Sequence, residues 1–416
     1  MTMENKKNVP EIRFKGFTKE WVKCDLRDVS TIKTGYPFNS SDFDGNGIYK
    51  VITNGNIQDN SAFVDNSTGN KINILDKQII KDYVLNIGDI LVTMDGTVGR
   101  TAKVNNLYQV LAQRVGRLIA NRSAEFLYQY LNTGEFHSLM TTVSVGGTIK
   151  HISLSDIGDF QIIKPTNDSE EYKIGAFLEK LDDLKALTEQ KLKKLKTIKK
   201  ACLEKMFPHN GSNTPEIRFK GFTEEWIKKH FGEFGSVSMN KRIFKYQTDS
   251  DGEIPFYKIG TFGGEPDSYI SRELFEEYKI KYPYPQIGDI LISASGSIGR
   301  TVEYKGADEY FQDSNIVWLA HDERLSNLFL KHLYSIIKWS GLEGSTIKRL
   351  YNKNILDTTF MLPNPEYKEK SIEEQIQIGN YFQNIDKLIF QTEQKIEKLK
   401  NIKKACLDKM FVNTED

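Results

Sequence analysis

Two long stretches of the chain carry apolar residues at steps of three and four positions, with Lys, Glu and Gln between them and no Pro. This spacing puts the apolar side chains on one stripe of an α-helix and is typical of coiled coils. We therefore predict one long helix over residues 170–207 and another over 371–411, each on the order of 50 Å long. The predicted stripe positions are Leu181, Leu184, Leu195 and Ile198 in the first helix and Ile385, Leu388, Leu399 and Ile402 in the second.

The two stripes match each other at an offset of 204 residues. This favours packing of one helix on the other over two separate amphipathic helices on domain surfaces. The match belongs to a longer internal repeat. PEIRFKGFT occurs at 10–18 and 215–223, IGDIL at 87–91 and 287–291, and IKKACL at 198–203 and 402–407. Since the blocks keep their order, one ancestral unit has been duplicated.

The rest of each repeat mixes short β-like runs with helical spacing. GDILVTM followed by Asp95-Gly96, and GDILISA followed by Ser295-Gly296, predict a strand and a hairpin turn. Residues 123–140 and 325–342 instead carry apolar residues at helical spacing. The predicted fold class is α+β, with two mixed α/β domains joined by two long helices. The predicted boundaries are 1–165 for the first domain, 170–207 for the first helix, 208–214 for a linker, 215–365 for the second domain and 371–411 for the second helix.

The string PEIRFKGFT predicts a junction. Ile12 and Phe14 alternate with Arg13 and Lys15 before Gly16, which predicts a short strand with one face buried. The second copy directly follows the first long helix. If a pseudo-two-fold axis relates the repeats, the C-terminal KMFVNTED should end near residue 10.

The composition adds limits on function. The 416 residues contain 57 Lys and Arg against 56 Asp and Glu, a formal net charge of +1, so nucleic-acid binding would have to use local basic surface. Cys24, Cys202 and Cys406 lie far apart, which argues against a disulfide framework or a zinc site. No stretch approaches the roughly 20 apolar residues of a membrane span, and the N-terminus lacks a signal-peptide pattern. We therefore expect a cytoplasmic protein without membrane contact.

Two strings look catalytic. Asn-Pro-Glu-Tyr at 364–367 resembles the Asn-Pro-Pro-Tyr loop of adenine methyltransferases, but it lacks the second Pro, and its place before the second long helix favours a turn. Asp267, Glu277 and Lys279 fit a nuclease pattern in which two carboxylates bind Mg²⁺ beside a lysine. The first repeat has no equivalent, so a solvated helix face is preferred. With no phosphate loop and no metal-ligand spacing among the six His, we predict a chain that is not itself an enzyme and holds no cofactor or metal.

Basic residues recur at matching places among the turns of both repeats, in QRVGR (113–117), TIKH (148–151), NKRIFKYQ (240–247) and TIKRLYNKN (346–354). Loop Lys and Arg beside Asn, Gln, Tyr and Ser are what phosphate and base-edge contacts use, although solvated loop charge would explain any single cluster. GYPFNSSDF (35–43) is a further candidate loop, with a structural turn as the alternative. The candidate DNA-binding residues are Tyr36, Asn39, Arg114, Arg117, Lys150 and His151 in the first repeat and Lys241, Arg242, Lys348 and Arg349 in the second. Arg100 and Arg300 are common to both repeats and are expected to serve the framework or a phosphate.

Taken in order, PEIRFKGFT with its following Glu-Trp, IGDIL with Gly-x-(Val/Ile)-Gly-Arg, Gly-(Gly/Ser)-Thr-Ile-Lys, and TEQK with IKKACL and KMF resemble the specificity subunit of a Type I restriction-modification system over about residues 10–411. The resemblance implies two target recognition domains, each reading one half of a split double-stranded DNA sequence, and two helices paired antiparallel as a spacer. It implies no catalytic activity of the subunit itself. It also implies assembly with two methyltransferase subunits, with or without two restriction subunits, to which S-adenosylmethionine, ATP and Mg²⁺ belong. Two alternatives stay open: a self-contained Mg²⁺-dependent endonuclease using Asp267, Glu277 and Lys279, and a purely structural coiled-coil scaffold.

Overall fold

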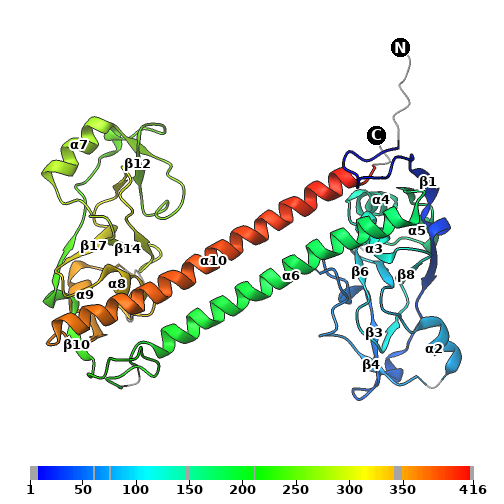
Figure 1. The fold of residues 1–416 in the computed structure, drawn as a ribbon, viewed down its shortest axis with the longest axis horizontal. Coiled ribbons are helices and arrows are strands. Elements are labelled where there is room, and N and C mark those ends of the chain that lie inside the picture. The colour runs from blue at the N-terminus through cyan, green and yellow to red at the C-terminus, as the bar shows by residue number, and fades with distance from the viewer. Residues whose placement is uncertain are drawn as a thin grey trace, which may run out of the picture. The chain divides into compact units, whose positions relative to one another are not determined.

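The computed structural model describes residues 8–59, 61–74, 76–146, 150–209, 211–341 and 349–412. The chain falls into two units (Figure 1), the first made of residues 1–189 and 394–416 and the second of residues 190–393. Each unit holds one copy of the repeated domain and about half of each of two long helices, α6 (Asp168–Lys205) and α10 (Lys368–Met410).

The first unit contains three small sheets. Strands β1 and β9 pair antiparallel, β2-β8-β5-β6 form an antiparallel sheet, and β4-β3-β7 form a sheet in which β3 and β7 are parallel. The strands are β1 (Val22–Asp25), β2 (Ser30–Thr34), β3 (Tyr49–Ile52), β4 (Lys71–Ile72), β5 (Ile90–Thr93), β6 (Thr101–Lys103), β7 (Gln109–Leu111), β8 (Val115–Ala120) and β9 (Gln161–Lys164). The helices are α1 (Leu26–Val29), η1 (Ser40–Asp42), η2 (Asn54–Asn56), α2 (Lys77–Tyr83), α3 (Ala124–Leu131), α4 (Glu135–Val143) and α5 (Leu154–Gly158).

The second unit repeats this arrangement. Its sheets are β10-β18, β11-β17-β14-β15 and β13-β12-β16, and β12 and β16 are parallel as β3 and β7 are. The strands are β10 (Ile227–His230), β11 (Gly235–Ser238), β12 (Ile254–Tyr257), β13 (Tyr269–Ile270), β14 (Ile290–Ser293), β15 (Thr301–Glu303), β16 (Tyr310–Phe311), β17 (Ile316–His321) and β18 (Thr359–Leu362). The helices are η3 (Phe231–Glu233), η4 (Lys245–Gln247), α7 (Arg272–Lys281), α8 (Asn327–Leu333) and α9 (Asn352–Asp357). The predicted hairpins are present, since β5 pairs with β6 and β14 with β15. The predicted α+β class is confirmed.

The core of each unit joins the domain to the beginning of one long helix. In the first unit Trp21, Phe126 and Leu178 belong to one buried cluster, and in the second Trp226, Phe329 and Phe382 do. Two glycines near the start of the long helices make this packing close. A Cβ on Gly175 would lie 2.8 Å from the backbone nitrogen of Phe126, and one on Gly379 would lie 2.5 Å from the Cβ of Leu328.

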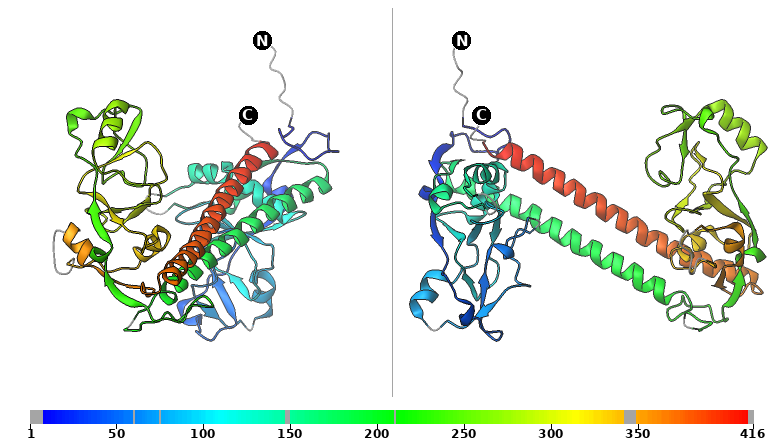
Figure 2. Two further views of the ribbon diagram at one scale, coloured as in Figure 1. Left: turned by 60° about the vertical axis from the view of Figure 1, so that its left-hand side comes forward. Right: turned by 180° about the vertical axis from the view of Figure 1, so that it is seen from behind.

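Helices α6 and α10 are each uninterrupted (Figure 2) and run antiparallel. In the first unit Lys403 Nζ lies 2.5 Å from Asp182 Oδ1, and in the second Lys199 Nζ lies 2.5 Å from Asp386 Oδ1. The charge pattern explains this direction. Residues 190–205 hold seven Lys and one Glu, and 394–410 hold six Lys and two acidic residues, whereas the first half of each helix has more acidic residues than Lys. Antiparallel pairing puts each basic half beside an acidic half, whereas parallel pairing would put like charges together.

The buried seam between the helices differs from the predicted stripe at four positions. Ile385 and Leu399 are 6% and 7% exposed, and Leu181 and Leu195 are half-buried. Leu184, Ile198, Leu388 and Ile402 are instead 39%, 47%, 43% and 37% exposed, so their placement in the seam was wrong. In each case the next residue along the helix is less exposed. Two of these next residues are lysines that form ion pairs with the facing helix. Lys199 pairs with Asp386, and Lys403 pairs with Asp182.

The PEIRFKGFT strings are irregular segments rather than the predicted strands, and Ile12 and Ile217 are 47% and 46% exposed. They are nevertheless junctions. The backbone N–H of Ile217 donates to the carbonyl of Lys205 at 3.0 Å, where α6 ends. The N–H of Ile12 donates to the carbonyl of Lys409 at 2.8 Å, near the end of α10. The prediction that the C-terminal segment lies near residue 10 is therefore confirmed for its described residues. Within the described part of the chain, none of the helices has the length and apolar character that crossing a membrane requires.

Candidate nucleic-acid interface

Two of the predicted residues of the first unit, Arg114 and His151, meet at Asp95. Arg114 Nη1 lies 3.0 Å from Asp95 Oδ2, and His151 Nδ1 lies 2.5 Å from Asp95 Oδ1. The Arg114 side chain is 65% exposed and that of His151 48%, whereas Asp95 is 14% exposed. The carbonyl of Lys150 accepts from the N–H of Gly96 at 2.9 Å, which places the Lys150 backbone beside this cluster, whereas its exposed side chain donates from Nζ to the carbonyl of Thr141 at 3.4 Å. The sequence pattern assigned Asp95 only to a turn, although its carboxylate is the group that pairs with both Arg114 and His151.

The loop at 35–43 lies beside this cluster. The N–H of Tyr36 donates to the carbonyl of Leu111, and the N–H of Gln113 donates to the carbonyl of Tyr36, both at 2.9 Å. Tyr36 is half-buried against Phe38 and Tyr83, with ring centroids 4.9 and 5.3 Å away. Asn39 is exposed at the start of η1. The loop therefore presents Asn39 more openly than Tyr36.

The second unit gathers its basic residues around the turn between β16 and β17. Arg242 Nε donates to Asp313 Oδ2 at 2.9 Å, and Arg349 Nη2 donates to the carbonyl of Ser314 at 3.1 Å. Exposed Lys241 lies with its Nζ 5.0 Å from the ring centroid of Tyr282. Lys348 lies outside the described residues. The structure thus brings Lys241, Arg242 and Arg349 to the same end of the domain.

Arg117 was predicted to contact DNA, but the structure buries it. Its side chain is 4% exposed within β8 and lies 2.6 Å from Asp89, and its Nη1 donates to the carbonyl of Val84 at 3.1 Å. An arginine held in this way inside the domain has no free surface for a phosphate or a base. Its position in the strand run VGRLIA was the signal that sequence reasoning passed over.

Arg100 and Arg300 hold loops in place in both units. Arg100 forms an ion pair with Asp59, and Arg300 Nη2 donates to the carbonyl of Gly263 at 3.2 Å. These contacts fit the framework role that their presence in both repeats suggested.

The nuclease alternative finds no support in the geometry. Asp267 pairs with Lys258 at 2.7 Å, Glu277 with Lys281 at 2.9 Å and Lys279 with Asp308 at 3.6 Å, so the three residues have separate partners. Within the described residues, no group of three or more His, Cys, Asp or Glu is placed to hold a metal ion. Asn364–Tyr367 form a turn before α10, as predicted, with the N–H of Tyr367 donating to the carbonyl of Asn364 at 3.1 Å.

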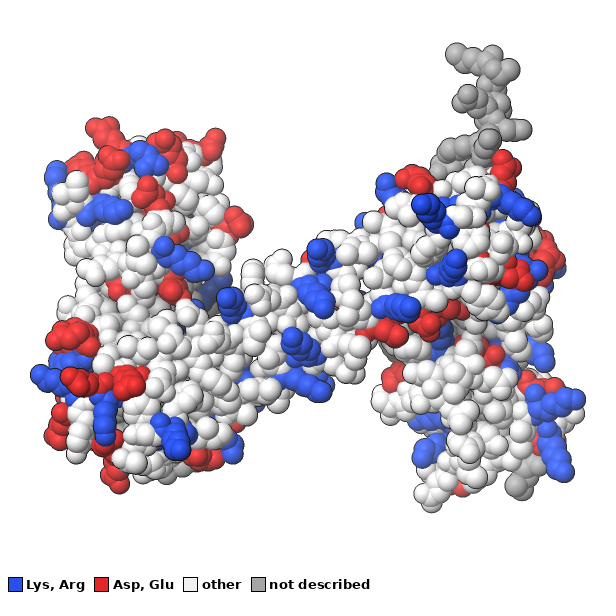
Figure 3. All heavy atoms as spheres, in the orientation of Figure 1, with Lys and Arg blue, Asp and Glu red and all other residues white. Residues whose placement is uncertain are grey.

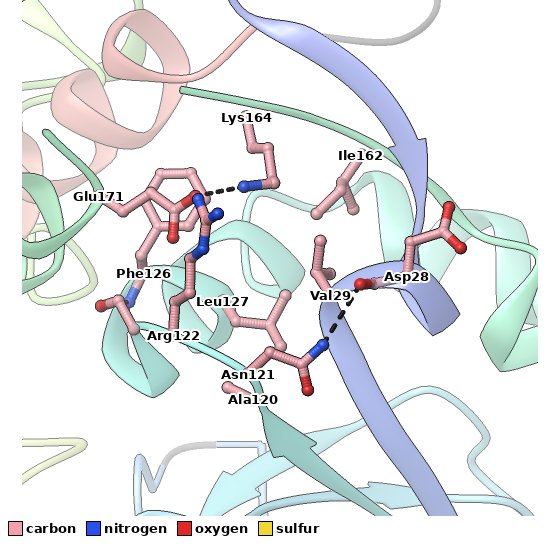
Figure 4. Close-up of a pocket in the computed structure, with 11 residues that line it drawn as sticks. Asp28, Val29, Ala120, Asn121, Arg122, Phe126, Leu127, Ile162, Lys164 and Glu171 are labelled. Carbon is pink, nitrogen blue, oxygen red and sulfur yellow. Dashed lines mark hydrogen bonds and ion pairs between the residues drawn. The ribbon is translucent and has the colours of Figure 1, made fainter. Parts of the chain in front are cut away.

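The first domain also contains a cavity of about 320 Å³ (Figure 4), which lies away from the Asp95 cluster. It adjoins the start of β2 and the end of β8, whereas the Asp95 cluster adjoins the end of β2 and the start of β8. Phe126, Leu127 and Ile162 give it an apolar wall, and Lys164 Nζ is 2.6 Å from Glu171 Oε1. Because its basic residues already have acidic partners, we assign no ligand to it.

The family model described as "Type I restriction modification DNA specificity domain" matches twice, at residues 18–197 and 223–401. The chain belongs to this family. The fold class and the resemblance stated from the sequence motifs are thereby confirmed.

Individual relatives agree with the family. The chain is 61% identical over 133 residues to the putative Type I restriction enzyme specificity subunit S.HindORF215P of Haemophilus influenzae, covering 32% of this chain and 34% of that protein. It is 27% identical over 174 residues to the putative MjaX specificity subunit of Methanocaldococcus jannaschii, covering 41% and 38%. The matched stretches therefore span little more than a third of these relatives.

Two solved structures share the fold. The S subunit of a Type I restriction-modification system from M. genitalium gives a TM-score of 0.63 at 16% identity, covering 98% of this chain and 100% of that chain. A chain from a structure on complex assembly and conformational transition of the Type I system gives 0.50 at 17% identity, covering 94% and 97%.

Proposed function

We propose that this chain is the DNA-recognition subunit of a Type I restriction-modification complex. Each unit reads one half of a bipartite double-stranded target, and the paired helices set the gap and dock two methyltransferase subunits. The proposal gives the chain itself no catalytic step. The observation that carries it is a repeated framework whose exposed loop residues differ between the two copies.

The framework of the two reading ends is the same. The loop after β2 contains η1, and the loop after β11 contains η4. In both, the side chain of the third helical residue accepts a hydrogen bond from the backbone N–H of the residue just before the helix. The residues displayed are different, since Asn39 corresponds to Phe244, His151 to Arg349 and Asp95 to Ser295. Side chains that differ on a common frame are what two readers of different base sequences require.

The proposed docking of methyltransferase subunits rests on exposed apolar residues that are the same in both units. Four such pairs occur in the described residues: Ile12 and Ile217, Ile87 and Ile287, Leu184 and Leu388, and Ile198 and Ile402. Exposed apolar side chains at repeated positions are expected to contact a partner that binds twice. Leu184 and Ile402 belong to the first unit and Ile198 and Leu388 to the second, so each unit offers one helical patch to one subunit.

The long helices also carry basic side chains on their surface (Figure 3). Lys and Arg side chains gather over the long helices on the face shown in Figure 3. Lysines on the spacer would contribute sequence-independent phosphate contacts between the half-sites. Adenine methylation requires the target base to leave the stack, and that step belongs to the methyltransferase subunits.

The test is methylation with and without a partner. We expect no methyl transfer by the purified chain, and adenine methylation at one bipartite sequence when the methyltransferase subunit encoded with it is added. Methyl transfer by the purified chain alone would contradict the proposal.

A further inference from the structure

Two aromatic side chains project from the loop that follows β11. Phe244 is 48% exposed and Tyr246 is 83% exposed. Their rings are nearly parallel, with an interplanar angle of 8° and centroids 5.7 Å apart. Because exposed apolar area is unfavourable in water, such a pair on a surface points to a bound partner.

The loop is held in shape before any partner binds. The N–H of Phe244 donates to Gln247 Oε1 at 2.9 Å, and the N–H of Gln247 donates to the carbonyl of Phe244 at 2.9 Å. Thr248 Oγ1 donates to the carbonyl of Lys245 at 2.9 Å. Tyr246 therefore stands on a fixed turn, so binding would lose little conformational entropy.

The surroundings of the pair are basic. Exposed Lys241, Arg242 and Lys245 belong to the same loop. Arg242 ties the loop to Asp313, and Arg349 binds the adjacent Ser314 while its guanidinium lies 5.9 Å from the ring centroid of Tyr351, which is 64% exposed. Alternating basic and aromatic side chains match the phosphates and base faces of a nucleic acid.

The first unit lacks this feature although its backbone is equivalent. Its η1 loop has the same pair of bonds, from the N–H of Asn39 to Asp42 Oδ2 at 2.9 Å and from the N–H of Asp42 to the carbonyl of Asn39 at 3.0 Å. It displays Asn39, Ser40 and Ser41 where the second displays Phe244, Lys245 and Tyr246. The aromatic pair is therefore not required by the framework.

We propose that Tyr246, supported by Phe244, packs against the bases of the half-site read by the second unit and locally unstacks them. This rests on the proposed function, and it assigns the two half-sites different modes of recognition. The second half-site is read partly by an aromatic wedge and the first by polar side chains. Apolar wedges of this kind act by partly separating neighbouring base pairs.

The experiment uses the complete chain assembled with its methyltransferase subunits and a duplex carrying its methylated sequence. The variants are Tyr246→Ser, which introduces the residue found in the first unit, Tyr246→Phe, which keeps the ring, and Lys245→Ala. Ser41→Ala in the first unit is the matched control. Binding is measured against salt concentration, and 2-aminopurine placed in either half-site reports unstacking.

We expect Tyr246→Ser to weaken binding on the order of ten-fold without changing the salt dependence, and to abolish the 2-aminopurine signal of the second half-site. Tyr246→Phe and Ser41→Ala should retain that signal. Lys245→Ala should reduce the slope of log K against log salt by about one. Unchanged affinity for Tyr246→Ser would overturn the inference, as would release of the methyltransferase subunits by that variant. Absence of sequence-specific binding by the unaltered complex would instead overturn the proposed function.

Discussion

Arg218 and Glu374 form a two-pronged ion pair that fastens the second PEIRFKGFT string to the beginning of α10. Nε to Oε1 measures 2.7 Å and Nη2 to Oε2 measures 2.9 Å, and the Glu374 side chain is 2% exposed. Arg13 and Glu170 repeat the pair in the first unit at 2.5 and 2.8 Å. In both units the repeated string is therefore attached by a bidentate ion pair to the beginning of a long helix.

Removing one member of the Arg218–Glu374 pair should lower the unfolding free energy. Glu374→Ala leaves the Arg218 guanidinium without its carboxylate in a half-buried site, and it removes the acceptor of the Trp226 indole N–H at 3.4 Å. We expect a loss of about 3–5 kcal/mol in the unfolding free energy, measured by urea denaturation. Lys409→Ala is the control, because its pair with Glu11 is 50% and 71% exposed and should matter little. Equal losses for the two variants would contradict the account.

Gly379 is a test of close packing. In Gly379→Ala the new Cβ meets Leu328 Cβ at 2.5 Å and the Leu328 carbonyl carbon at 2.7 Å, so α8 and α10 must move apart. Ala is intrinsically better than Gly in a helix by about 1 kcal/mol, yet we expect the variant to unfold at a lower urea concentration. Gln383→Ala, at an exposed site on the same helix, should not. A stabilised Gly379→Ala variant would show that the two helices do not approach so closely.

His332 should make the second unit sensitive to acid. It is 2% exposed, its ring lies 5.0 Å from that of Phe382, and Asp386, Lys199, Lys331 and Glu303 are the charged groups around it. Burial lowers the pKa of His332 to about 4 from its ordinary value near 6.5. The folded unit thus binds fewer protons than the unfolded chain between these values, and its stability falls as the pH drops from 6.5 to 4.

The matched variant is His332→Gln, because Gln129 occupies the corresponding position in the first unit and donates to Asp182 at 2.8 Å. We expect His332→Gln to flatten the pH dependence of the urea midpoint between pH 6.5 and 4. Gln129→Ala should leave that pH dependence as it is. A dependence equally steep in His332→Gln and the unaltered chain would refute the role given to this residue.

The exposed helical patches should each hold one methyltransferase subunit. Leu184→Ser with Ile402→Ser alters the patch of the first unit, and these residues are 39% and 37% exposed, so folding should change little. Native mass spectrometry of the co-expressed complex should then show one methyltransferase subunit in place of two. Leu187→Ser, at a 63% exposed site outside the patch, is the control. Retention of two subunits by the double variant would exclude the patch as the docking site.

The sequence correctly predicted the features that depend on the internal repeat and on the spacing of apolar residues. The duplicated plan, the two long helices, the hairpins after GDIL and the neighbourhood of residues 12 and 409 are all present. These features follow from local spacing or from comparing one copy with the other.

The failures concern residues whose role depends on a distant partner. Lys199 and Lys403 occupy seam positions because Asp386 and Asp182 face them, so an apolar stripe read from one helix shifted to Ile198 and Ile402. Arg117 can be buried because Asp89, just before the neighbouring strand β5, pairs with it. Basic character alone could not separate Arg117 from Arg114, whose 65% exposed side chain reaches Asp95 at the surface.

The central claim is that each unit reads its own half of one target. Its most direct measurement is long-read methylation sequencing of cells that express the chain with its methyltransferase subunit, before and after residues 24–160 are exchanged for another domain of the same family. We predict a bipartite methylated sequence in which the exchange alters one half and leaves the other half unchanged. An unaltered sequence, or a change in both halves, would contradict the account.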